Sequence, residues 1–382
     1  FEAILVVMCP FFTQRLLMLR PHVLSVTIML AFCWHLTRAR NPWPSFGFGF
    51  FTAYAYSNPH LILLPAAVFA ALKFRKDARL ALLVPLAALG GLLAGLTLHP
   101  QFPNTFVLWK IQCVDVIRQA ALQESPVYLG TELYRPKAAW HGQNAAFFLL
   151  LALNLLSLRR VRFRELPFDT SFFLILQAVT AFGVLFNKRV FEYGWPFAVL
   201  AAGLVFRDLS QAGFFERFTA RVRERALLGA HVVIVAAFCI VGVYMLRWVW
   251  PYQTRELRDF PEWASRNLPT GTAVANPNWS DFPLLFYGAP QFRYSLGIEP
   301  MFGYDAMPWQ VAKLEAFRTG RIMLAPKELG NLTQARYAFV GMRAWRLARD
   351  MHRSGYFFVY QNENEGWLFD LEHLPASSEK KK

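Results

Sequence analysis

Charge is scarce in this sequence. Only 17% of its 382 residues are Asp, Glu, Lys or Arg, whereas a water-soluble domain carries about 25%. Hydrophobic residues make up 55%, which excludes an intrinsically disordered chain, and the apolar runs are bunched before Trp250. Several of these runs approach the roughly 20 residues that cross a bilayer core about 30 Å thick. The composition therefore predicts an integral membrane protein.

Cysteine is also scarce, and its spacing argues against a disulfide scaffold or a zinc site. Cys9, Cys33, Cys113 and Cys239 form no CxxC pair, and three of the four sit in apolar runs, as core residues do. A P-loop, a dinucleotide fingerprint and a nucleophile elbow are missing, so NTPase, dehydrogenase and hydrolase functions have no support. We expect no cofactor, and no motif supports a divalent metal.

Acidic residues number 25 against 40 Lys and Arg, which gives a formal net charge of +15. A nucleic-acid-binding protein would carry a basic face interleaved with stacking aromatics. Here the basic residues gather instead in short clusters between apolar runs, as they do in cytoplasmic loops of membrane proteins. Nucleic acid is therefore not an expected partner. The clusters are Arg38 to Arg40, Lys73 to Arg79, Arg159 to Arg164 and Arg217 to Arg225.

These clusters predict the path of the chain across the membrane. With every cluster on the cytoplasmic side, the intervening runs form about seven or eight membrane elements. The run Pro44 to Leu72 starts and ends at cytoplasmic clusters, and Pro59 interrupts it, so we predict a broken helix pair. The outer side then receives the loop His99 to Gln143, the turn Asn187 to Tyr193 and everything after Trp250.

The composition after Trp250 changes to that of a water-soluble domain. We therefore predict a transmembrane helical domain over residues 1–250 and an extracytoplasmic α/β domain over residues 251–382. Strands are expected at Thr272 to Asn276, Phe292 to Leu296, Tyr337 to Gly341, Phe357 to Gln361 and Trp367 to Leu371, with helices at Thr254 to Leu268, Asp281 to Tyr287, Trp309 to Phe317 and Ala344 to His352.

The turn Asn187 to Tyr193 carries the strongest chemical signal. It places Lys188 and Arg189 on the side where the charge rule expects few cations. We predict that Arg189 holds a lipid phosphate as a bidentate fork, that Lys188 adds a point charge and that Glu192 orients Arg189. The alternative is an Arg189–Glu192 pair that closes the helix turn, or simple snorkelling.

Other candidates lie in the outer loop and in the C-terminal domain. Glu132 is a weak candidate for an acid or base, with a structural hydrogen bond as its alternative. His99, Asn104, Trp279, Asp281 and Arg293 are predicted to line a sugar or acceptor cleft. Ser280 or Asp281 is also expected to cap the helix that starts near Phe282.

Three segments together resemble bacterial polytopic proteins grouped with the GT-C glycosyltransferases, which are similar in plan to dolichyl-phosphate-mannose protein mannosyltransferases. They are His99 to Asn104, Lys188 to Phe197, and Asn278 to Phe282 followed by Arg293 to Pro300. The resemblance implies inverting transfer of a sugar from a polyprenyl-phosphate carrier to an acceptor outside the membrane. It also implies a bacterial inner membrane location with a periplasmic C-terminal domain.

The resemblance leaves the catalytic residue open. In that superfamily an acidic residue follows the first membrane helix, and no such loop is visible before Val23. The chain begins at Phe1, so we expect further sequence upstream that carries this residue, or a relative that has lost catalysis. In the second case the chain would be an inactive membrane subunit that docks onto a larger assembly with protein partners. Membrane lipids and a polyprenyl-phosphate-linked sugar are the partners of the first reading. A transporter is the least favoured class, because the apolar runs contain few charges.

Overall fold

The computed structural model describes residues 11–12, 22–55, 58–122, 125–130, 133–157, 166–214, 257–297 and 300–373, with single positions at 225, 229, 232, 236, 243 and 247. The chain divides into two compact units. The helical unit comprises residues 1–123 and 130–247, and the C-terminal unit comprises residues 124–129 and 248–382.

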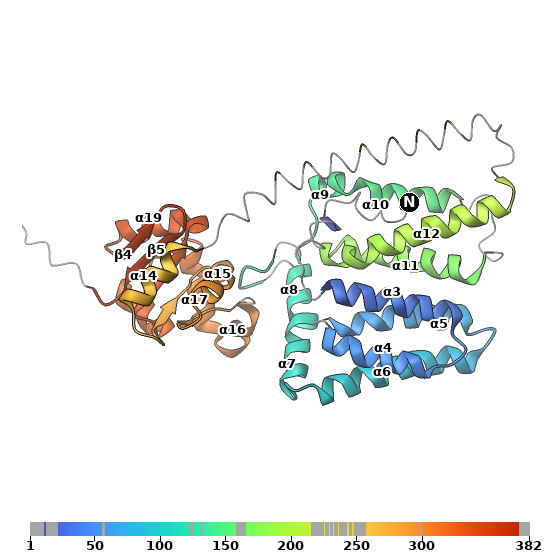
Figure 1. The fold of residues 1–382 in the computed structure, drawn as a ribbon, viewed down its shortest axis with the longest axis horizontal. Helices are drawn as coiled ribbons and strands as arrows, with labels where there is room; N and C mark the ends of the chain where they lie inside the picture. The colour runs from blue at the N-terminus through green and yellow to red at the C-terminus, as the bar shows by residue number, and fades with distance from the viewer. Residues whose placement is uncertain are drawn as a thin grey trace, which may run out of the picture. The chain divides into compact units, whose positions relative to one another are not determined.

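The helical unit is built from apolar helices, which run side by side in Figure 1. The predicted break separates α4 from α5, since Asn58 and Pro59 interrupt the helix as expected. The elements are α3 (His22–Arg38), α4 (Trp43–Ala55), η1 (Pro59–Ile62), α5 (Leu63–Lys73), α6 (Ala78–Leu98), α7 (Asn104–Lys110), η2 (Ile111–Asp115), α8 (Val116–Leu122), α9 (Ala138–Gln143), α10 (Ala145–Ser157), α11 (Phe168–Val184), η4 (Lys188–Val190) and α12 (Phe191–Gln211).

Among the described residues, α6 is the one helix that is long and apolar enough to cross a membrane. Only 39% of its apolar window is buried, so most of that window faces outward instead of packing in a protein core. Shorter apolar helices of 10–17 residues occur at Val23–Arg38, Pro59–Lys73, Ala145–Ser157 and Phe168–Val184. The described part of the fold is thus largely helical, with one helix that is both long and apolar enough to cross a membrane. Most of the predicted last span, Leu227 to Val249, lies outside the described residues.

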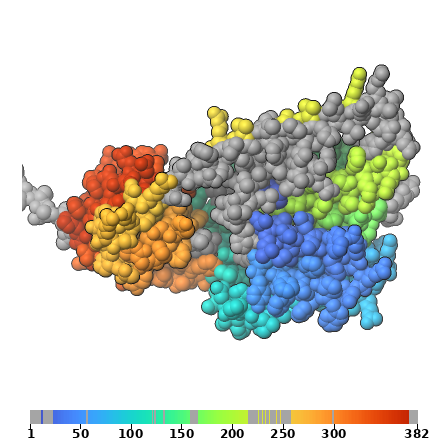
Figure 2. Space-filling view, viewed as in Figure 1, coloured from blue at the N-terminus to red at the C-terminus, as the bar shows by residue number. Residues whose placement is uncertain are grey.

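Helices α4 and α6 pack closely because glycines lie between them. A Cβ built on Gly91 would lie 1.9 Å from the Phe46 carbonyl oxygen, and one on Gly49 would lie 2.1 Å from the Ala88 carbonyl oxygen. The contacts advance in the same direction along both helices, so α4 and α6 are parallel and α5 returns between them in the chain. The α3 to α6 part forms a continuous blue surface in the space-filling view (Figure 2).

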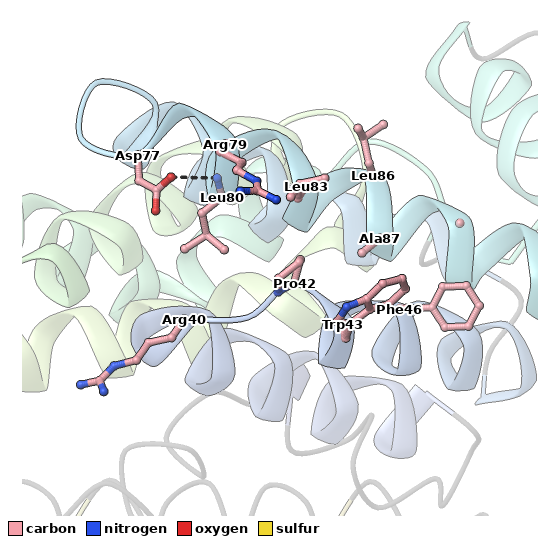
Figure 3. A pocket seen from close by; sticks show the side chains of 11 residues that line it. Arg40, Pro42, Trp43, Phe46, Asp77, Arg79, Leu80, Leu83, Leu86 and Ala87 are labelled. Carbon is pink, nitrogen blue, oxygen red and sulfur yellow. Dashed lines mark hydrogen bonds between the residues drawn. The ribbon is translucent and has the colours of Figure 1, made fainter.

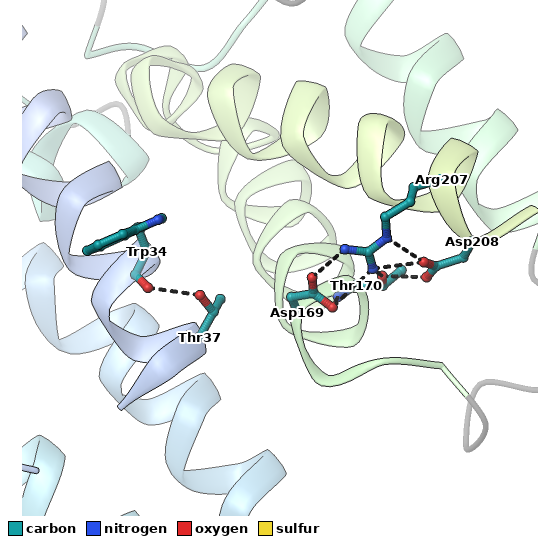
Figure 4. Close-up of polar contacts among 6 residues, drawn as sticks. All are labelled: Trp34, Thr37, Asp169, Thr170, Arg207 and Asp208. Carbon is teal, nitrogen blue, oxygen red and sulfur yellow. Dashed lines mark hydrogen bonds and ion pairs between the residues drawn. The ribbon is translucent and has the colours of Figure 1, made fainter. Parts of the chain in front are cut away.

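The basic segments converge on one end of the helical unit. Arg40 and Arg79 line the same groove, and the Lys73 ammonium lies 4.6 Å from the Phe168 ring centroid at the start of α11. At the same start of α11, Arg207 donates to Asp169 at 2.8 Å and to Asp208 at 2.8 Å, as Figure 4 shows. The arginine therefore joins the beginning of α11 to the end of α12.

The C-terminal unit contains a five-stranded mixed sheet with the strand order β2-β1-β3-β5-β4. Strand β1 is parallel to β2 and β3, while β5 is antiparallel to β3 and β4. Alternate residues of β3 enter two cores, Phe339 on one face and Val340 on the other. The sheet is therefore covered on both faces, as an α/β domain requires.

The strands and helices of this unit follow the predicted order. Two helices, α16 and α18, were not predicted. The elements are α14 (Asp259–Asn267), β1 (Ala273–Ala275), η6 (Trp279–Asp281), α15 (Phe282–Gly288), β2 (Arg293–Tyr294), α16 (Pro300–Ala306), α17 (Pro308–Arg318), α18 (Pro326–Thr333), β3 (Tyr337–Gly341), η7 (Met342–Ala344), α19 (Trp345–Arg353), β4 (Phe357–Asn362) and β5 (Gly366–Asp370).

Candidate functional site

The break between α4 and α5 supplies the first wall of a polar cavity. Asn58 is buried although it lies at the interruption of the helix. Its Oδ1 accepts a hydrogen bond from the Cys113 Sγ at 3.0 Å, and the Trp109 Nε1 donates to the His60 Nδ1 at 3.3 Å. The helical stretch from α7 to η2 thus supplies hydrogen-bond partners for two polar side chains at the break.

The turn before α12 supplies the second wall. The Asn187 Oδ1 accepts a hydrogen bond from the Arg189 backbone N–H at 2.8 Å, which caps the short helix η4. Glu192 lies in the first turn of α12, where the positive end of the helix dipole favours a carboxylate. Its side chain is fully buried. Arg189 therefore lies in a turn whose backbone is fixed by a side-chain hydrogen bond, and Glu192 lies in the first turn of the helix that follows.

The two walls enclose a cavity of about 50 Å³ within the helical unit. Its polar lining comes from the break, from η2 and from the η4 turn, and comprises Asn58, His60, Gln112, Asn187, Arg189, Glu192 and Tyr193. The Gln112 Oε1 is buried and has no hydrogen-bond partner among the described residues. A buried acceptor without a partner costs about 1–3 kcal/mol.

The structure brings two of the three predicted phosphate-site residues to this cavity. Arg189 and Glu192 line it, whereas Lys188 is half-buried in η4 and is not part of its lining. The volume has room for one or two water-sized groups. A lipid carrier would therefore place only a small polar part there.

His99 and Asn104 lie at a different place in the helical unit. His99 lines a separate groove of about 300 Å³ together with Pro59 and Trp109. Its ring centroid lies 4.9 Å from that of Tyr54, and its Nδ1 accepts a hydrogen bond from the Gln101 N–H at 3.2 Å. Asn104 is exposed at the first position of α7 and lines neither space. The break at Asn58 and Pro59 contributes to both spaces.

The predicted helix cap at Asp281 is wrong. Asp281 has helical dihedrals, with φ −82° and ψ −19°, because η6 precedes α15 without interruption. A capping residue needs extended dihedrals before its side chain can reach the first helical N–H groups. The Asp281 Oδ2 instead accepts the Gly341 N–H at 3.0 Å. Its side chain therefore ties α15 to the end of the central strand β3.

Asp281 is a buried carboxyl group of the C-terminal unit whose pKa is raised. Burial raises its pKa to about 6, while the Gly341 N–H, the charge of Arg343 and the Asn278 amide act in the opposite direction. A Cβ on Gly341 would lie 2.6 Å from the Asp281 Oδ1, so the carboxyl group fits only against glycine. The neighbouring Glu365 is bound to backbone N–H groups of Asp259 and Phe260, both at 2.8 Å. The side chains of Asp281 and Glu365 thus both accept hydrogen bonds from backbone N–H groups of other segments.

The remaining cleft candidates are separate within the C-terminal unit. Trp279 lies beside Tyr128, with ring centroids 6.5 Å apart. Arg293 is exposed on β2, and its Nε donates to the Gly271 carbonyl at 3.0 Å. Arg293 does not line the small pocket that contains Asp281. Glu132 lies outside the described residues.

Sequence reasoning missed the lining residues contributed by Asn58, His60 and Gln112. Two polar residues flank Pro59 inside an apolar run, and that signal was sufficient to nominate them. The sequence gives no comparable signal for Gln112. It lies in the π-helical segment η2, where the periodicity of an α-helix no longer predicts which residues face inward.

Among the described residues, no group of three or more His, Cys, Asp or Glu side chains is placed to hold a metal ion. Comparison with protein-family models finds no match for the chain. Comparison with curated proteins finds no match either.

Proposed function

We propose that this chain is a polytopic glycosyltransferase-like protein of the bacterial inner membrane, with its C-terminal unit in the periplasm. In this proposal it transfers a sugar from a polyprenyl-phosphate carrier to an acceptor on the outer side. The observation that carries the proposal is the cavity in which Arg189 meets polar groups of the helix break. The resemblance of the three sequence segments to GT-C glycosyltransferases supplies the reaction class.

Arg189 is the proposed contact for the carrier phosphate. A guanidinium forms two parallel hydrogen bonds with phosphate oxygens, and such contacts are stronger away from bulk water. The phosphate is the leaving group, so a cation beside it stabilises the charge that develops in the transition state. Lys188 would add a second positive charge from the same turn. Glu192 would orient Arg189 from the first turn of α12.

The wide apolar outer surface supports placement in a membrane. Leu82, Leu86 and Leu93 of α6 are exposed, as are Leu149 and Leu153 of α10. Monomeric water-soluble proteins rarely expose apolar surface on such a scale. The polar cavity would then lie at the end of the helical unit opposite to the basic segments.

Replacement of Arg189 tests the proposal. We expect Arg189→Lys to weaken binding of a polyprenyl phosphate to the purified full chain, because an ammonium lacks the planar fork, and Arg189→Ala to weaken it further, by about tenfold or more. Native mass spectrometry in detergent measures the bound fraction. Lys137→Gln is the matched control, since Lys137 is exposed and does not line the cavity.

Two outcomes would contradict the proposal. Unchanged lipid binding in Arg189→Ala would remove the phosphate contact. If Arg189 serves only to pair with Glu192, the double variant Arg189→Ala/Glu192→Ala would regain the thermal stability that each single variant loses, and lipid binding would be the same in all of them.

An inactive membrane subunit is the second candidate function. It is favoured by the surface of α15, on which Leu284, Phe286 and Tyr287 are exposed, Tyr287 to 86%. Exposed apolar side chains gathered on one short helix are typical of a protein-binding surface. Co-purification of the full chain with stoichiometric membrane partners, lost in Phe286→Ser/Tyr287→Ser, would favour this function over the transferase.

A further inference from the structure

A groove of about 680 Å³ lies between the start of α4 and the first half of α6. Figure 3 shows its two walls, with Arg79, Leu83 and Ala87 on α6 and with Pro42, Trp43 and Phe46 on the opposite side. The close glycine contacts between the helices, at Gly49, Gly91 and Gly95, lie at and beyond the Gly90 end of the groove. The groove is therefore the open end of a tightly packed helix pair.

The groove has one cationic end and one apolar end. Arg40, Asp77 and Arg79 lie at the beginning of the two walls, whereas Leu83, Leu86 and Gly90 follow along α6. The Asp77 Oδ1 accepts the Leu80 N–H at 2.9 Å and so serves as the helix cap. Arg40 and Arg79 are exposed and form no ion pair with any described residue. Two positive charges and the one negative charge of Asp77 therefore lie at the mouth of an apolar trench, which leaves it net positive.

The dimensions and the charges point to a single class of occupant. From Asp77 to Gly90 the α6 wall spans about 20 Å at 1.5 Å per residue, which accommodates an extended acyl chain. Trp43 is 73% exposed beside the arginines, and tryptophan is enriched at the level of lipid headgroups. We propose that this groove binds one anionic phospholipid of the leaflet that faces the basic segments, with its phosphate between Arg40 and Arg79 and an acyl chain along Leu83 and Leu86.

This lipid site is distinct from the Arg189 cavity. The two share no lining residue, and the phospholipid would serve as a bound structural lipid, not as a substrate. The surrounding loop adds Arg75 and Lys76, which attract anionic lipid without touching the groove. A test must therefore separate a built site from diffuse attraction by basic residues.

The purified full chain in mild detergent is titrated with phosphatidylglycerol and with phosphatidylcholine, and native mass spectrometry counts bound lipid. We expect phosphatidylglycerol to bind more tightly. The double variant Arg40→Gln/Arg79→Gln should lose about tenfold in phosphatidylglycerol affinity, because two charge-assisted contacts are removed. The matched double variant Arg75→Gln/Lys76→Gln removes the same amount of charge from the neighbouring loop before α6 and should change the affinity by less than about twofold.

A third variant tests the apolar end. Leu83→Trp fills the trench without a change in charge and should also lower phosphatidylglycerol affinity. Equal losses in the two charge variants, or equal binding of the two lipids, would overturn the proposal. If Leu83→Trp instead converted a dimer into a monomer and left lipid binding intact, the groove would be an interface between copies and the proposal would be wrong.

Discussion

Asp281 is a carboxyl group that the fold buries beside a glycine. Its pKa is raised to about 6 from the ordinary value of 3.8, mainly because burial penalises the charged form. Between these two values the folded state holds a proton that the unfolded state releases. Stability from this group is therefore greatest below about pH 4, falls as the pH rises towards 6, and stays lower above it.

The first prediction follows from this loss of stability as the pH rises. Between pH 7 and pH 5 the Asp281 contribution should rise by on the order of 1 kcal/mol. Asp281→Asn cannot titrate, so the variant should lack this gain and its melting temperature relative to wild type should be lower at pH 5 than at pH 7 by about 4 °C. Differential scanning fluorimetry of the full chain at both pH values measures it. An identical pH dependence in both proteins would contradict the burial argument.

At the residue scale the sequence identified Arg189 and Glu192 but not the groups that meet them. A cation in a short turn can be recognised from a single sequence, because the apolar runs on either side show that a charge is unusual at that position. Asn58 and Gln112 meet it only through the chain path, since η1 and η2 are brought to η4 by packing of α5, α7 and α8. No local pattern encodes that meeting.

At the scale of elements, the α4–α6 contact gives the second prediction. Gly91→Ala should destabilise the helical unit, because its Cβ would lie 1.9 Å from the Phe46 carbonyl oxygen and the backbones must separate. A loss of about 1–3 kcal/mol is typical of overpacking. Gly47→Ala is the matched control on the same helix pair, since nothing lies within 4 Å of its added Cβ. This control should be neutral or stabilising by up to about 1 kcal/mol.

Thermal unfolding of both variants in the same detergent compares them directly. Equal melting temperatures for Gly91→Ala and Gly47→Ala would show that α4 and α6 are not in contact at Phe46. The comparison isolates the backbone approach, because both changes add one methyl group and both raise helix propensity.

The strands of the C-terminal unit were predictable because each is short, contains β-branched or aromatic residues and is bounded by turn residues. Tyr337–Gly341 has the predicted bounds, and the hairpin of β4 and β5 encloses the predicted turn. Helices α16 and α18, of 7 and 8 residues, were not predicted. In the helical unit, apolar periodicity located the helices but not their ends, because Arg207 and Asp208 continue α12 through an ion network that the sequence does not reveal.

At the scale of the whole molecule, the direction of the helices organises the charges. Basic residues of the loops before α4 and before α6 meet at one end of the helical unit, and the turns at Asn58 and Asn187 meet at the other. This separation agrees with the path expected from the positive-inside rule. It does not follow from hydrophobicity alone, since four of the apolar helices are shorter than a bilayer span.

The last prediction concerns sidedness. In a variant whose four cysteines are replaced by serine, single cysteines are introduced by Lys76→Cys, in the basic loop before α6, and by Lys327→Cys, in α18. Both positions are exposed within their own units. We expect a membrane-impermeant maleimide to label position 327 in intact spheroplasts and position 76 only after permeabilisation, because Lys73, Arg75 and Arg79 remain to hold that loop on the cytoplasmic side.

A cytoplasmic cysteine marker in the same cells reports whether the membrane is intact. Labelling of position 76 but not of position 327 in intact cells would invert the topology, and with it the assignment of the Arg189 cavity to the outer leaflet. Labelling of both positions while the marker stays protected would contradict a membrane between the basic loop before α6 and the C-terminal unit.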